Sequence, residues 1–155
     1  MAVILFRAAR TDEAEQLTEL ALRSKSHWGY DEVFLEACRA ELTLRPEELA
    51  ARRIVVAELA GRVLGFYGVE GAPPHGELGH LWIDPASIGT GMGRRLWEHA
   101  MGTARAAGFT RLMIEAEPYA EGFYLAMGAV RVGETPSGSV PGRVLPLLHV
   151  DTRTA

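Results

Sequence analysis

Three glycines at alternate positions, Gly89, Gly91 and Gly93, stand out in the segment "SIGTGMGRRLW". A helical pattern overlaps them, with apolar side chains recurring every three or four residues from Met92 to Ala107. The first N–H groups of a helix have no carbonyl partner, and the peptide dipoles place partial positive charge there. Glycines let an anion approach such N–H groups directly. The segment therefore predicts a phosphate-binding turn at a helix N-terminus.

The residues of this turn exclude two familiar phosphate loops. A P-loop ends in Gly-Lys-Ser/Thr, whereas Gly93 is followed by Arg94 and Arg95. A dinucleotide-binding fingerprint has its last glycine one residue later, and it normally follows the first strand of a parallel sheet. An unrelated nucleotide-binding domain stays open as an interpretation, and it predicts that ATP or NAD competes for the turn.

Composition narrows the class of protein. The 155 residues are 48% hydrophobic and 23% charged, which is typical of a single globular domain spanning residues 1–155. The formal net charge of −4 predicts no general affinity for nucleic acid or for a membrane surface. The single cysteine, Cys38, has no cysteine partner for a disulfide or a metal, so no metal site is expected. No apolar run approaches the about 20 residues needed to span a bilayer, and we expect a cytoplasmic protein.

Hydrophobic periodicity predicts the order of the elements. A strand at 3–6 precedes two helices that begin near residues 11 and 31. Later strands are expected at 54–59, 63–69, 76–84, 111–117, 129–134 and 142–150, with helices at 92–107 and 121–127. Pro146 favours an edge or a bulge for the last strand, because proline cannot donate to a ladder. The order indicates a mixed α/β sheet with seven strands and four helices, antiparallel in its first half and crossed over by a helix in the middle.

Two segments together resemble the GCN5-related N-acetyltransferase (GNAT) family. "IGTGMG" is similar to the family's Gln/Arg-x-x-Gly-x-Gly signature, with Ile88 in the first position. "EAEPYAEGFYLAMGAVRVGE" is similar to its second signature, with Tyr124 at the tyrosine position and Glu117 in place of an asparagine. The resemblance implies the GNAT fold and acetyl coenzyme A as co-substrate. It implies that the turn binds the pyrophosphate through the main chain of Ile88, Gly89, Thr90, Gly91, Met92, Gly93 and Arg94.

The resemblance also implies how the acetyl group is held and released. Main-chain groups of Leu81, Trp82 and Ile83 would pair with the pantetheine arm like an added strand. Tyr124 would stabilise the departing thiolate. Proton transfer from a phenol with a pKa near 10 to the thiolate of a thiol with a pKa near 8.5 is unfavourable by about 2 kcal/mol. Hydrogen bonding is therefore favoured over complete proton transfer. A core tyrosine without a catalytic role is the alternative.

Glu77 is the expected general base, because it matches the position of that base in the histone-modifying members of the family. An ordinary glutamate cannot readily deprotonate an ammonium, since their pKa values differ by a gap of roughly 8 kcal/mol. Either burial raises the pKa of Glu77, or the carboxylate acts through water after the amine has attacked. A solvated carboxylate at a strand edge is the alternative. His80, Glu115 and Asp84 are reserve candidates.

The same resemblance implies that the segment "SKSHWGYD", between the first two helices, selects the acceptor. There His27, Trp28 and Tyr30 would line a pocket for an apolar or aromatic amine. Trp28 could instead anchor the corner to the core. The leading interpretation is direct acetyl transfer to a primary amine of a small molecule or peptide, without a metal. A non-catalytic module that senses acyl coenzyme A is the alternative, and homodimers paired through C-terminal strands are common in the family.

Overall fold

The computed structural model describes residues 3–154, and its seven strands form one sheet in the order β1-β2-β3-β4-β5-β7-β6. Four α-helices lie in this described part of the chain, and none is both long and apolar enough to cross a membrane. The elements are β1 (Leu5–Ala8), α1 (Ala14–Ser26), α2 (Glu32–Leu42), β2 (Ile54–Leu59), β3 (Arg62–Glu70), β4 (His75–Ile83), α3 (Met92–Ala106), β5 (Arg111–Glu115), α4 (Glu121–Ala126), β6 (Val130–Pro136) and β7 (Val144–Asp151). The predicted element order and mixed fold class are confirmed.

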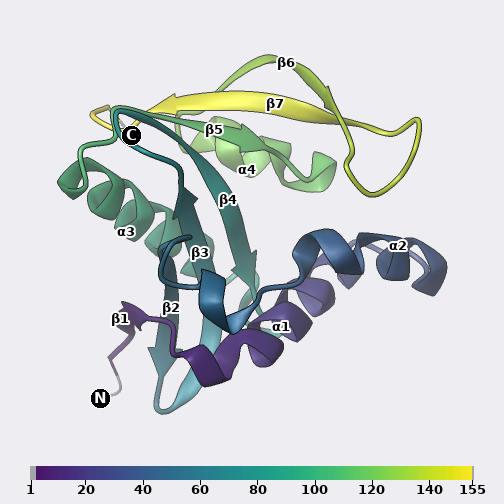
Figure 1. The fold of residues 1–155 in the computed structure, drawn as a ribbon, viewed down its shortest axis with the longest axis horizontal. Helices are drawn as coiled ribbons and strands as arrows, with labels where there is room; N and C mark the ends of the chain where they lie inside the picture. The colour runs from purple at the N-terminus through teal and green to yellow at the C-terminus, as the bar shows by residue number, and fades with distance from the viewer. Residues whose placement is uncertain (1–2, 155) are drawn as a thin grey trace.

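The sheet changes direction at its centre. Strands β1 to β4 are antiparallel neighbours, β4 and β5 are parallel, and β5, β7 and β6 are again antiparallel. Helix α3 makes the crossover from β4 to β5, as the pattern predicts. Figure 1 shows β5, β6, β7 and α4 together in the upper part of the view, with α1 and α2 below and to the right.

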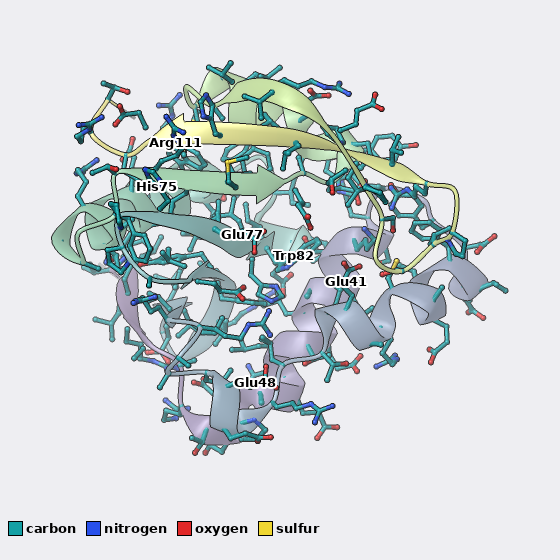
Figure 2. All side chains as sticks on the ribbon, turned by 45° about the horizontal axis from the view of Figure 1, so that its top comes forward. Glu41, Glu48, His75, Glu77, Trp82 and Arg111 are labelled. Carbon is teal, nitrogen blue, oxygen red and sulfur yellow. The ribbon has the colours of Figure 1, made fainter. Side chains whose placement is uncertain are left out.

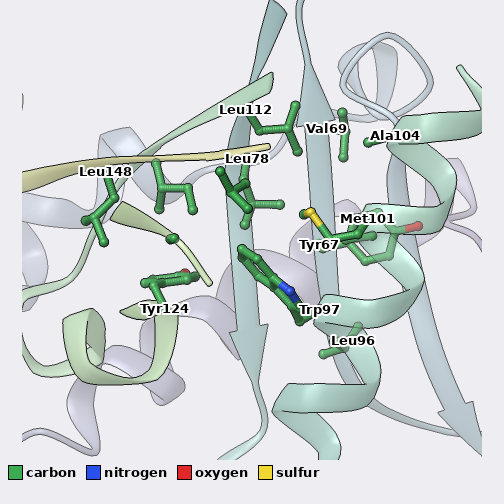
Figure 3. Close-up of a cluster of buried hydrophobic side chains, with 14 of the residues drawn as sticks. Tyr67, Val69, Leu78, Leu96, Trp97, Met101, Ala104, Leu112, Tyr124 and Leu148 are labelled. Atoms are coloured by element: carbon green, nitrogen blue, oxygen red, sulfur yellow. The ribbon is translucent and has the colours of Figure 1, made fainter. Parts of the chain in front are cut away.

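Helices cover both faces of the sheet because alternate strand residues face opposite sides. On one face, Tyr67 of β3 packs in a cluster with Leu96 and Trp97 of α3 (Figure 3). On the other face, Phe66 packs in a cluster with Leu17 of α1. The two buried clusters therefore hold α3 and α4 on one side and α1 and α2 on the other.

Two strand predictions need correction. The first strand lies at Leu5–Ala8, not at 3–6, because pairing with β2 sets its register from Leu5 opposite Glu58 to Ala8 opposite Val55. The last strand, β7, is an inner strand of the sheet, although it contains Pro146. The Pro146 carbonyl accepts from the N–H of Ala116, just beyond the end of β5. In an antiparallel pair the N–H and C=O of one residue point to the same neighbour, so the proline lacks a ladder donor only at the position where β5 ends.

Strands β4 and β5 share only a short ladder before they separate. Three residue pairs join them, and the last is Glu77 opposite Met113. Gly79 is the extra residue of a bulge in β4, where Gly68 and Val69 of β3 pair with His80 and Leu78. A Cβ on Gly79 would overlap the Glu70 carboxylate, so only glycine fits there without displacing Glu70. The bulge therefore lies where β4 leaves β5.

Close packing at the short ladder predicts a stability effect. A Cβ on Gly76 would lie 2.5 Å from the Glu70 carbonyl oxygen and would also overlap the Phe109 ring. We expect Gly76→Ala to lower the free energy of unfolding by about 1–3 kcal/mol in urea denaturation followed by tryptophan fluorescence. The matched control is Gly122→Ala in α4, where no atom lies within 4 Å, and we expect it to be neutral or stabilising by up to about 1 kcal/mol. Equal stability of the two variants would contradict the prediction.

Candidate functional site

A cavity of about 670 Å³ opens where β4 and β5 separate. Its walls come from α1, α2, β4, the glycine turn, the residues after β5, and α4. In Figure 2, Glu77 and Trp82 lie between the β5 side of the sheet and the two N-terminal helices, whereas His75 and Arg111 mark the paired starts of β4 and β5. The cavity therefore lies where hydrogen bonds between β4 and β5 would otherwise continue.

The glycine turn presents backbone N–H groups at one end of this cavity. Gly89 and Gly91 have φ angles of +85° and +87°, which other residues adopt only with strain. The N–H groups of Ile88 and Thr90 are used within the turn by the carbonyls of Pro85 and Ser87. No acceptor in residues 3–154 is found for the N–H groups of Gly89, Gly91, Met92, Gly93 and Arg94. The turn thus offers an anion five N–H groups at the start of α3.

The predicted cofactor-binding residues mostly meet at the cavity. Gly93 packs tightly there, since a Cβ would lie 3.0 Å from Ile83 and 3.1 Å from Phe123. The Met92 side chain is buried in the core, and the Thr90 hydroxyl donates to the Ser87 carbonyl, so neither lines the cavity. The residues from this set that do line it are Leu81, Trp82, Ile83, Ile88, Gly89, Gly91, Gly93 and Arg94.

Tyr124 of α4 lines the cavity from its apolar side. Its side chain packs against Trp97 (Figure 3), with ring centroids 5.9 Å apart, and against Phe123, with ring centroids 5.4 Å apart. Burial and the nearby Glu117 carboxylate raise the pKa of Tyr124 above its ordinary value. Tyr124 is only 7% exposed, but its hydroxyl makes none of the side-chain hydrogen bonds of residues 3–154 and is not among the buried atoms that lack a partner, so the oxygen is accessible from the cavity. A neutral hydroxyl is therefore available to a ligand in the cavity.

Glu77 lines the same cavity near the last β4–β5 pair. Burial and the carboxylates of Glu115 and Glu70 raise the pKa of Glu77, while Arg52 acts in the opposite direction. A carboxylate that is disfavoured in this way becomes a better proton acceptor. Glu115, one of the reserve candidates, also lines the cavity, so a molecule bound there would meet both carboxylates.

The other two reserve candidates are engaged within the protein. Burial and the charge of Arg52 lower the pKa of His80 to about 3, so the ring stays neutral at physiological pH. Its Nδ1 accepts from the Trp82 indole at 3.0 Å, and its Nε2 lies 2.9 Å from the Arg52 guanidinium. Asp84 does not line the cavity. Its carboxylate accepts from the N–H of Ala86 and pairs with Arg23 at 3.2 Å.

Only one of the three predicted acceptor-side residues lines the cavity. Trp28 does so, whereas His27 and Tyr30 do not. Tyr119, which the sequence analysis missed, stacks on Trp28 with ring centroids 5.4 Å apart and also lines the cavity. The sequence offered one signal for Tyr119, which is its position in the second signature, two residues after Glu117. Ser24 and Lys25 of the predicted acceptor segment and Met127 of the second signature also line the cavity, as do Glu41, Arg52 and Glu70, which no pattern indicated.

The fold and the site define an α/β protein that presents free N–H groups, within residues 3–154, at a helix N-terminus beside a cavity between two separating parallel strands. The model of the acetyltransferase (GNAT) family matches residues 14–129, so the chain belongs to this family. The predicted family is confirmed, and membership supports acyl transfer as its general activity.

Solved structures share the fold over almost the whole chain. The PaiA N-acetyltransferase of Thermoplasma acidophilum, in complex with coenzyme A, is 18% identical, covers 96% of this chain and 99% of its own, and has a TM-score of 0.76. A GCN5-related N-acetyltransferase of Rhodopseudomonas palustris is 21% identical, covers 97% of each chain and has a TM-score of 0.78. YncA of Salmonella typhimurium, a putative acetyltransferase with acetyl-CoA, is 20% identical, covers 97% and 94%, and has a TM-score of 0.67. No curated protein sequence matches significantly.

The crowding of carboxylates around Glu77 makes a titration prediction. We expect the pKa of the Glu77 carboxyl to lie above its ordinary value of about 4.3, and Glu115→Gln to lower it by removing a neighbouring negative charge. Carboxyl-carbon NMR, assigned with Glu77→Gln, measures both values. Because the folded-state pKa is raised, ionised Glu77 destabilises the protein at neutral pH, and this penalty disappears as the pH falls below 4. A Glu77 pKa at or below the ordinary value would contradict the prediction.

Proposed function

We propose that the protein is an N-acetyltransferase that moves an acetyl group from acetyl coenzyme A to a primary amine of a small molecule or peptide by direct transfer. The observation that carries the proposal is the row of five N–H groups at the glycine turn that have no acceptor in residues 3–154, at the end of the cavity that Tyr124 lines. The complexes of the Thermoplasma protein with coenzyme A and of the Salmonella protein with acetyl-CoA support the choice of co-substrate.

The glycine turn and β4 fit the two ends of this co-substrate. The N–H groups from Gly89 to Arg94 suit a diphosphate, because they combine donors with the positive end of the α3 dipole. In the part of the chain that the structure describes, no strand pairs with the β5 side of β4 beyond Glu77. Main-chain groups of Leu81, Trp82 and Ile83 can therefore pair with the amides of the pantetheine arm, as an added strand would.

Tyr124 suits the stabilisation of the leaving thiolate. When the amine nitrogen bonds to the acetyl carbon, the C–S bond breaks and negative charge develops on sulfur. The raised pKa of Tyr124 keeps its hydroxyl protonated, so the side chain donates a hydrogen bond to sulfur without giving up its proton. The amine nitrogen releases one proton, which a base takes up first and which then reaches the thiolate through water, so that the products are the amide and the free thiol.

Glu77 suits the acceptance of that proton. The amine must be neutral to attack, and its nitrogen becomes acidic once the new C–N bond has formed. The raised pKa of Glu77 favours proton uptake at that stage. The carboxylates of Glu77 and Glu115 also attract a cationic amine into the cavity before it reacts.

Two other functions lead to different measurements. A module that senses acyl coenzyme A would bind the co-substrate but form no product with any amine. An unrelated nucleotide-binding domain would bind ATP or NAD in competition and would not bind coenzyme A. The experiments that follow distinguish these outcomes.

A substitution in the glycine turn tests co-substrate binding. We expect calorimetry to detect coenzyme A binding to the wild-type protein, no displacement by ATP or NAD, and at least a hundredfold weaker binding to Gly91→Val. The valine Cβ branches would cover the N–H groups and strain a residue with a φ of +87°. Gly61→Val is the matched control, because Gly61 has a φ of +82° and open space around its Cα but lies in the β2–β3 turn. Unchanged binding in Gly91→Val would refute the assignment of the turn.

Removal of one hydroxyl tests catalysis separately. We expect Tyr124→Phe to lower kcat about a hundredfold while the Kd for coenzyme A stays within a factor of two. Stability should hold, because the hydroxyl makes no hydrogen bond within residues 3–154 and the ring remains. Mass spectrometry of an amine and peptide library incubated with acetyl coenzyme A measures product formation. If both proteins form product at the same rate, Tyr124 has no part in the mechanism. If the wild-type protein binds coenzyme A but forms no product, the protein is a sensor and not an enzyme.

A further inference from the structure

Glu117 is a buried carboxylate at the cavity wall whose charge is fully engaged inside the protein. Its side chain is 6% exposed, and one carboxylate oxygen lies 2.6 Å from the Nζ of Lys25, which is itself 9% exposed. The two residues come from different layers, since Lys25 belongs to α1 and Glu117 follows β5. This ion pair therefore bridges the opening between the two halves of the sheet.

Two further side chains complete the network around Glu117. The Tyr30 hydroxyl donates to the other Glu117 oxygen, and the Arg143 guanidinium donates to the Tyr30 hydroxyl at 2.7 Å. Arg143 also lies 3.6 Å from Glu117. Aromatic rings enclose the cations, since Tyr30 stacks on Phe34 and the Arg143 guanidinium lies 4.7 Å from the Phe34 ring centroid. Glu117 thus joins α1, the α1–α2 connection and the β6–β7 loop.

The charge balance prevents Glu117 from serving a ligand as well. One carboxylate offsets two buried or half-buried cations, Lys25 and Arg143. If Glu117 turned towards a bound molecule, the Lys25 ammonium would be left unpaired in a buried site, which is strongly unfavourable. Apart from its effect on the pKa of Tyr124, Glu117 therefore acts through the residues that it holds.

The residues held by this network form the acceptor side of the cavity. The N–H of Tyr119 lies 3.5 Å from a Glu117 oxygen, and the Tyr119 ring meets the edge of the Tyr30 ring at 5.8 Å. Trp28 in turn stacks on Tyr119. We propose that Glu117, with Lys25, Tyr30 and Arg143, is a positioning device for the acceptor wall made by Trp28 and Tyr119, and that it takes no part in holding coenzyme A. This inference rests on the proposed acetyltransferase function.

A single hydroxyl deletion tests the proposal without leaving a buried charge unpaired. We expect Tyr30→Phe to raise the acceptor KM at least fivefold, with kcat and the Kd for coenzyme A within a factor of two of wild type. The probes are tryptamine, phenethylamine, cadaverine and a lysine-containing tetrapeptide, and KM is measured for the one that reacts fastest. Tyr67→Phe is the matched control, because it removes a buried hydroxyl that donates to Thr103 on the opposite face of the sheet. It should leave the acceptor KM unchanged.

A second measurement needs no reactive amine. We expect hydrogen exchange of the backbone amides in residues 28–31 and 137–143 to accelerate at least tenfold in Tyr30→Phe and in Glu117→Gln, and to stay at the wild-type rate in Tyr67→Phe. Unchanged exchange in both segments would overturn the proposal. So would a loss of coenzyme A affinity in Tyr30→Phe with an unaltered acceptor KM. If wild-type protein acetylates none of the four probes but the exchange result holds, the proposed function is in question and the positioning network is not.

Discussion

The parting of β4 and β5 after Glu77 is the constraint on which the rest of the structure depends. A fully paired parallel sheet leaves room for a ligand only beyond its strand ends. Here three residue pairs are enough to fix the relative position of the two strands, and the bulge at Gly79 then lets β4 turn away. The separation creates the cavity, exposes one edge of β4 and delivers the glycine turn to the rim of the same cavity. Fold and site therefore share one cause.

The sequence carried most of the fold because its signals are local. Periodicities of two and of 3.6 residues sufficed for the order of elements, and the alternating glycines marked positions where a positive φ is needed, as Gly89 and Gly91 have. The start of β1 could not be read in this way, because the apolar run at 3–6 has no internal boundary and pairing with β2 decides the register. The inner position of β7 depends on where β5 ends, which is a property of the sheet.

The acceptor side was less predictable because its contacts span long stretches of chain. Lys25 and Glu117 are 92 residues apart in sequence. A pattern could place Tyr30 in a corner between two helices, but not show that its hydroxyl faces Glu117 and that Tyr119 takes the place at the cavity wall. The replacement of an asparagine by Glu117 was visible in the sequence, whereas the cations that make a buried carboxylate tolerable there were not.

Burial in this cavity acts on its ionisable groups in opposite directions that suit the proposed reaction. It raises the pKa of Tyr124, an acid that must stay protonated to donate to sulfur, and it raises the pKa of Glu77, a base that must take up a proton. It lowers the pKa of His80, whose ring nitrogens face Trp82 and Arg52, so this ring adds no positive charge to that of Arg52. Because desolvation always favours the neutral form, burial at one cavity keeps Tyr124 a donor and makes Glu77 a better acceptor. Neighbouring carboxylates add to the effect of burial at each residue, Glu117 at Tyr124 and both Glu115 and Glu70 at Glu77.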